Sequence, residues 1–114
     1  MASYSPVFSS QFIVFTDAAP NTEFAVPAGF TAVVRDLTCQ TNFGGVIAQA
    51  ALANDVDAPD VVFAQVSTGG APGYDQWTGR VVIPGGGFIR LFVSSVDSGT
   101  SIYVGGYLLR DTLT

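Results

Sequence analysis

The 114-residue sequence contains no lysine, no histidine and only one cysteine, and 11% of its residues are charged. A typical soluble domain has about 25% charged residues. Without histidine, neither a Ser-His-Asp triad nor a three-histidine zinc site can form. A single cysteine excludes an intrachain disulfide, and Cys39 lies in a strand-like segment, which is typical of a small buried hydrophobic residue. We therefore expect a protein that is not an enzyme and that uses no metal or other cofactor.

Positive charge is also scarce, since the net charge is −5. The basic residues are four isolated arginines, Arg35, Arg80, Arg90 and Arg110. Nucleic-acid binding needs clustered Lys and Arg, so we expect no nucleic-acid partner. The longest weakly polar run, 44–53, is too short to span a bilayer, so we expect no membrane partner. The first residues show neither a basic start nor a continuous apolar stretch, and we expect synthesis in a cytoplasm without a signal peptide.

The sequence does contain many apolar residues (48%), and turn residues interrupt it about every ten positions. The segment 46–53 has a composition that also suits a helix, but its short length between turn clusters favours a strand. The chain is long enough for one domain and one core. We expect an all-β, single-domain antiparallel β-sandwich over 11–114, with a jelly roll favoured over other Greek-key arrangements. About eight strands are predicted, at 11–16, 22–26, 30–41, 46–53, 61–67, 74–83, 88–95 and 101–110.

Several predicted strands are apolar on both faces. In the first strand, Phe12 and Val14 are expected on one face and Ile13 and Phe15 on the other. A sheet with one face in water should instead alternate apolar and polar residues. Either loops cover the outer faces, or neighbouring subunits do, as in a homo-oligomer or a larger assembly.

Residues 1–10 precede the expected sandwich domain, and we expect them to form an N-terminal arm because they show no strand pattern. A disordered terminus is the ordinary expectation for such a segment. The alternative is an arm that binds a partner protein through its apolar residues, which are Tyr4, Pro6, Val7 and Phe8.

One cluster has the composition of a ligand site, namely Tyr74, Asp75, Gln76 and Trp77. An aromatic ring beside an amide and an acid is typical of sugar-binding surfaces. The alternative is that Trp77 anchors the core or a sheet edge.

A second cluster is the acidic loop 54–60. A helix-flanked calcium loop needs an oxygen ligand and a glycine at the positions that Pro59 and Asp60 occupy here. This difference favours a solvated turn.

Two stretches resemble a known class of proteins. These are VPAGFTAVVRDL at 26–37, and WTGRVVIPGGGFIRLFVSS followed by SIYVGGYLL within 77–109. The pattern resembles small β-sandwich virion proteins of tailed bacteriophages, of the capsid decoration and the neck or tail accessory type. The resemblance implies a structural virion protein that binds the major capsid protein or other virion proteins and stabilises the outer surface of the head. The alternative is a tail or neck module, or a carbohydrate- or receptor-binding module of the virion that uses residues 74–77.

Overall fold

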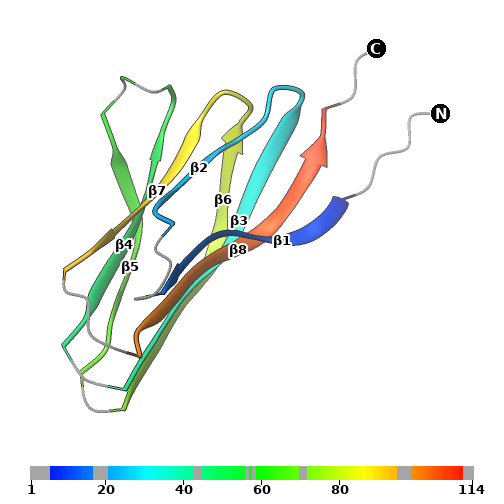
Figure 1. Cartoon of the computed structure of the whole chain (residues 1–114). Coiled ribbons are helices and arrows are strands. Elements are labelled where there is room, and N and C mark those ends of the chain that lie inside the picture. Colours follow the sequence, from blue (N-terminus) through cyan, green and yellow to red (C-terminus); the bar gives the residue numbers. More distant parts are fainter. Residues whose placement is uncertain are drawn as a thin grey trace.

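The computed structural model describes residues 6–16, 21–42, 45–55, 57, 59–69, 72–94 and 99–111, with side chains from Gln11 onward. The described residues form strands and connecting turns, and they include no helix long and apolar enough to cross a membrane. The eight strands (Figure 1) are β1 (Pro6–Thr16), β2 (Glu23–Ala25), β3 (Phe30–Thr41), β4 (Ile47–Ala53), β5 (Val61–Ser67), β6 (Gly73–Pro84), β7 (Phe88–Val93) and β8 (Ser101–Arg110). The predicted all-β class is confirmed, and the ambiguous segment 46–53 is a strand.

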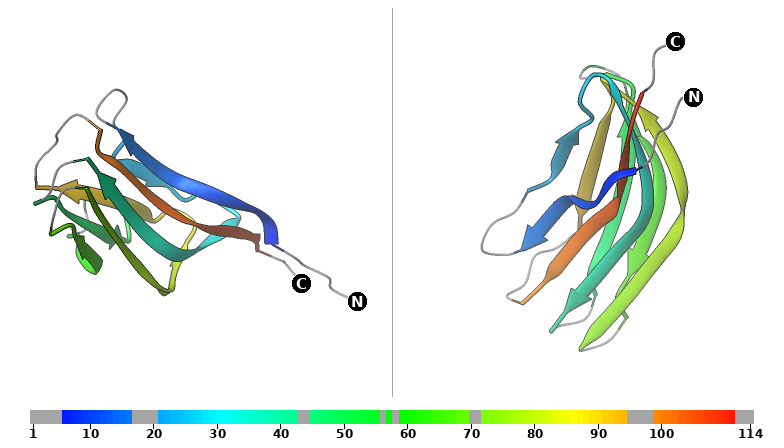
Figure 2. Two further views of the ribbon diagram at one scale, coloured as in Figure 1. Left: turned by 90° about the horizontal axis from the view of Figure 1, so that it is seen from below. Right: turned by 90° about the vertical axis from the view of Figure 1, so that its right-hand side faces the viewer.

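The strands form two four-stranded antiparallel sheets, which we call sheet A and sheet B. Sheet A has the order β1-β8-β3-β6, and sheet B has the order β2-β7-β4-β5. Strands β1 and β8, β2 and β7, β3 and β6, and β4 and β5 are paired. This nesting is the one obtained when a single long antiparallel hairpin is wrapped into two facing layers, as in a jelly roll. Figure 2 shows the two layers, with strongly twisted strands.

Strand β1 begins at Pro6, before the predicted start at Gln11. Pro6 lies opposite Leu109, and Phe8 lies opposite Leu108, so this part of β1 extends along the last strand (Figure 1). Residues 6–10, which the sequence analysis assigns to an arm, therefore belong to sheet A. Period-2 patterning failed to identify them because PVFSS has no clear alternation.

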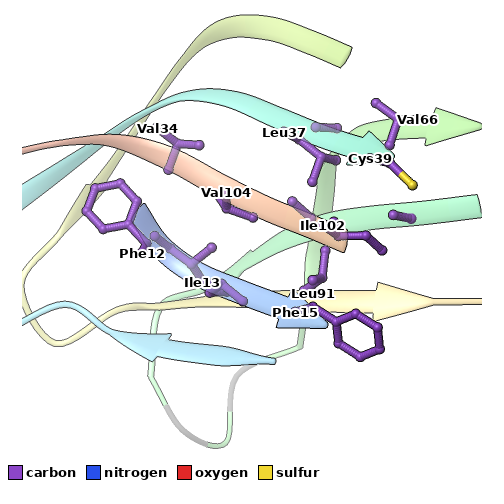
Figure 3. Close-up of a cluster of buried hydrophobic side chains, with 14 of the residues drawn as sticks. Phe12, Ile13, Phe15, Val34, Leu37, Cys39, Val66, Leu91, Ile102 and Val104 are labelled. Carbon is purple, nitrogen blue, oxygen red and sulfur yellow. The ribbon is translucent and has the colours of Figure 1, made fainter. Parts of the chain in front are cut away.

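The core lies between the two sheets, and the two sheets contribute side chains of different size to it. Sheet A contributes large residues such as Phe12, Ile13 and Leu37, drawn in Figure 3. Sheet B contributes three alanines, Ala48, Ala50 and Ala64, besides larger residues such as Leu91. Large residues opposite small ones let the two layers interdigitate at the density of a protein interior.

Two β-bulges lie at the same level of sheet A, one on each side of β8. In β1 the register shifts between Gln11 and Ile13, and in β3 it shifts between Val34 and Asp36. A bulge adds one residue to a strand and so interrupts its alternation. Phe12 and Ile13 are consecutive, yet both are buried in the core. The expectation that Phe12 shares a face with the half-exposed Val14 is therefore wrong, and the bulge is the reason.

Strand β8 passes between the bulges with a pair of glycines, Gly105 and Gly106. A Cβ on Gly106 would overlap the carbonyl oxygen of Val33 and lie 3.1 Å from Cε2 of Phe12. Only a residue without a side chain fits this close approach of two backbones. The glycine is therefore required by the packing of β8 between β1 and β3.

We expect Gly106→Ala to lower the free energy of unfolding by about 2–3 kcal/mol, because the methyl group must displace the β3 backbone or the Phe12 ring. Urea unfolding followed by circular dichroism measures the change. The matched control is Gly69→Ala, since a Cβ on Gly69 would have no atom within 4 Å. Its effect should stay within about 0.5 kcal/mol. Equal stability of the two variants would contradict the packing described here.

Candidate functional site

The four residues of the predicted ligand cluster, 74–77, lie on β6, an edge strand of sheet A. The alternation of the strand separates them into two pairs. Tyr74 and Gln76 are exposed on the outer face of the sheet, whereas Asp75 and Trp77 lie on the side that faces sheet B. The structure therefore does not bring the four side chains together on one surface.

Trp77 packs at the edge of the core. Its ring meets Phe63 of β5 edge to face, with 5.7 Å between the ring centroids. A Cβ on Gly79 would come within 2.5 Å of Cζ2 of Trp77, so the indole covers this glycine. Trp77 thus fills the space between β5 and β6, where the two sheets meet without pairing.

Asp75 also joins these two strands. One oxygen of its carboxylate accepts a hydrogen bond from the backbone N–H of Ser67 in β5 (2.9 Å), and the other accepts one from the N–H of Gln76 (2.9 Å). On the outer face, the Tyr74 hydroxyl donates to Oε1 of Gln76 (3.2 Å). These bonds give the Asp75 carboxylate, the Tyr74 hydroxyl and Oε1 of Gln76 intramolecular partners.

The apolar residues of the predicted arm fall in two places. Tyr4 lies outside the described residues. Pro6, Val7 and Phe8 belong to β1, whose backbone here pairs with the last residues of β8.

A hollow of about 410 Å³, not predicted from the sequence, lies on the outer face of sheet A. Gly105 lines it, between Tyr103 and Tyr107 on the same strand. The other lining residues are Gln11, Arg35, Asp36 and Gly106. The signal in the sequence is the spacing Tyr-x-Gly-x-Tyr within a strand, which places two rings on one face with a gap between them.

The outer face of sheet B has a polar centre at Arg90. Nε of Arg90 donates to Glu23 of β2 (2.7 Å), and NH1 donates to Asp60 of the acidic loop (2.9 Å). The guanidinium also lies 5.2 Å from the centroid of the Phe88 ring. The hydrogen bond that Arg90 donates to Glu23, and then the one that it donates to Asp60, raise the pKa of Arg90 above its ordinary value. Asp60 therefore acts as an ion-pair partner in this structure.

Beside this centre, sheet B has exposed apolar residues. Ile47 and Phe92 line a second hollow, of about 220 Å³, together with Gln49. Gln49 donates from Nε2 to Oε1 of Gln65 on the neighbouring strand (2.7 Å). The exposed fractions are 40% for Ile47 and 43% for Phe92, so both rest partly on the sheet and partly in solvent.

Cys39 is buried in the core among large side chains of sheet A, as labelled in Figure 3. Burial, with a smaller contribution from the negative charge of Asp75, raises the pKa of the thiol. The described residues include no group of three or more His, Cys, Asp or Glu side chains that could hold a metal ion.

Comparison with known proteins gives little additional information. No family model matches the chain, and no curated protein matches it. Among solved structures, the chain is similar to one described as the structure of infectious bursal disease virus, Gt strain, with 17% sequence identity and a TM-score of 0.31. The alignment covers 95% of this chain and 30% of that chain, so this chain spans less than a third of the viral chain. A similarity this distant carries no information about function.

We expect Trp77→Ala to lower the free energy of unfolding by about 2–4 kcal/mol, because it leaves a cavity between β5 and β6. Tyr74→Ala, on the outer face of the same strand, is the control and should change it by no more than about 0.5 kcal/mol. Urea unfolding followed by far-ultraviolet circular dichroism compares the two without relying on tryptophan fluorescence. If Trp77→Ala were as stable as Tyr74→Ala, the assignment of Trp77 to the core edge would be wrong.

We expect Cys39 to be unreactive toward Ellman's reagent in the folded protein at pH 8, and fully reactive in urea. Because the pKa is raised in the folded state, the stabilisation linked to the protonated thiol is present below the ordinary thiol pKa. It is lost as the pH rises through the folded-state pKa. The urea midpoint of the wild type should therefore fall more steeply above pH 8 than that of Cys39→Ala. Parallel curves, or rapid labelling of the folded protein, would contradict this.

Proposed function

We propose that this chain is a non-enzymatic structural protein of a virus particle, and that it binds the outer surface of a phage shell as a capsid decoration protein. The observation that supports this most is that each outer face has exposed apolar side chains. Sheet A has Val14 and Val82 in solvent, and sheet B has Ile47 and Phe92. Jelly rolls occur in viral capsid proteins, in lectins and in cupins, and exposed apolar residues on both sheets fit the first of these uses best.

The polar residues give no support to a catalytic role. Asp60 pairs with Arg90, and Asp75 accepts hydrogen bonds from two backbone amides, so each has a structural role. A histidine-based metal site of the cupin kind is excluded by the sequence, which has no histidine. A protein with so few charges, several of them paired within its own fold, is suited to binding other proteins through its uncharged surface.

In this proposal the mechanism is cross-bridging. Each copy binds neighbouring subunits of the shell at once, so rupture of the shell must also break those contacts. Burial of apolar side chains contributes about 25 cal/mol per Å² to each contact. Repeated over a symmetric shell, modest contacts of this kind are sufficient to raise its resistance to rupture.

We expect aspartate substitutions on an apolar outer face to abolish binding to particles of the source virus that lack this chain. Ile47→Asp with Phe92→Asp tests sheet B, and Val14→Asp with Val82→Asp tests sheet A. An unpaired charge buried in the contact should weaken binding by at least about a hundredfold for the face in use. Co-sedimentation with particles measures the bound fraction.

The controls add a charge at exposed polar positions that lie outside the strands of both sheets, Asn21→Asp and Asn54→Asp. Both should bind as the wild type does. A deletion that tests the N-terminal residues must end at Ser5, because β1 begins at Pro6. If the wild type fails to co-sediment, or if both double variants bind normally, the proposal is wrong.

A further inference from the structure

We propose that the hollow over Gly105, on the outer face of sheet A, is a binding site for a neutral saccharide. The site is separate from residues 74–77 and does not depend on the proposed role in a virus particle. Its volume of about 410 Å³ lies within the usual range of about 300–1,000 Å³ for small-molecule sites.

Two aromatic rings bound the hollow along strand β8. Tyr103 and Tyr107 are four residues apart, which corresponds to about 13 Å along a strand. Both are partly exposed, and Gly105 between them has no side chain to fill the gap. The backbone at Gly105 and the Asp36 carboxylate beside it therefore form the floor of an open space between two tyrosines.

Polar groups bound the hollow across the sheet. Gln11 of β1 and Asp36 of β3 lie directly opposite Gly105 in the strand register. The two β-bulges are at this level, and the extra residue in β3 is Arg35, which also lines the hollow. Bulges are found near binding sites because they redirect side chains.

Two of these polar side chains are placed by neighbouring groups, Arg35 by a hydrogen bond and Asp36 by the space over Gly105. Nε of Arg35 donates to the carbonyl oxygen of Gly79 on β6 (3.1 Å), which uses one of the five N–H donors of the guanidinium. A Cβ on Gly105 would lie 2.8 Å from Oδ1 of Asp36, so this carboxylate extends over the glycine. The glycine thus makes room both for the carboxylate and for a ligand.

This combination matches the chemistry of a sugar. A pyranose ring has an apolar C–H face, which packs on a tyrosine ring, and a rim of hydroxyl groups that both donate and accept hydrogen bonds. Asp36 supplies acceptors, Arg35 supplies donors, and Gln11 supplies both. The carboxylate of Asp36 and the net charge of −5 disfavour an anionic ligand, whereas a purely apolar ligand would cover Asp36, Gln11 and the remaining donors of Arg35 without offering them hydrogen bonds.

The test is a nuclear magnetic resonance titration of the isotopically labelled full chain with neutral disaccharides, namely maltose, cellobiose, lactose and diacetylchitobiose. We expect at least one of them, at millimolar concentration, to shift the backbone amides of Tyr103, Gly105 and Tyr107 in a saturable way. Sialyllactose serves as the anionic probe and should bind more weakly than lactose.

The variants Tyr103→Ala and Tyr107→Ala should each weaken binding by about tenfold or more, because each loses one stacking face. Tyr103→Leu and Tyr107→Leu retain apolar bulk over the sheet, and they should lose binding to the same degree while keeping the fold. Tyr74→Ala, an exposed tyrosine on the same face but outside the hollow, is the matched control and should bind as the wild type does.

The proposal fails if no neutral disaccharide shifts these amides, if only sialyllactose binds, or if Tyr74→Ala weakens binding equally. None of these outcomes bears on particle binding, which is measured separately.

Discussion

The ring of Phe12 packs against the bare backbone of Gly106, and the form of sheet A depends on this contact. A Cβ on Gly106 would meet both the Phe12 ring and the Val33 carbonyl, so β1, β8 and β3 come together here only because the residue is glycine. The bulges in β1 and β3 lie at this level. On the inner side they bury Phe12 beside Ile13, and on the outer side they leave the hollow between Tyr103 and Tyr107.

Several of the few charged side chains have partners within the fold. Arg90 joins β2 to the acidic loop, Arg35 binds a carbonyl of β6, and Arg110 lies 5.7 Å from the ring centroid of Phe30. The outer surface of sheet A therefore presents tyrosines, valines and amides as well as charges, and that of sheet B presents Ile47, Phe92 and amides beside Arg90. Such a surface binds other molecules by shape, stacking and hydrogen bonds more than by long-range attraction. Both the proposed shell contact and the proposed saccharide site use this property.

The sequence was sufficient to predict the strand content and the sandwich, because alternation and turn residues are local signals. It could not predict the bulges. One extra residue in a strand exchanges which of the following side chains point to each face of the sheet, and the hydrophobic pattern does not show where that residue lies. Phe12 was consequently placed with Val14. The hollow was missed for the same reason, because Gln11 and Asp36 come to lie opposite Gly105 only through pairing between distant strands. Residues 74–77 were conspicuous in the sequence because they are consecutive, but consecutive residues of a strand point to opposite faces.

The central claim, a structural role in a virus particle, is tested most directly by quantitative mass spectrometry of purified particles from the source. The measured quantity is the ratio of this chain to the major shell protein. A decoration protein should be present in a copy number comparable with that of the shell protein, because it repeats with the symmetry of the shell. Absence of the chain from the particles would contradict the account.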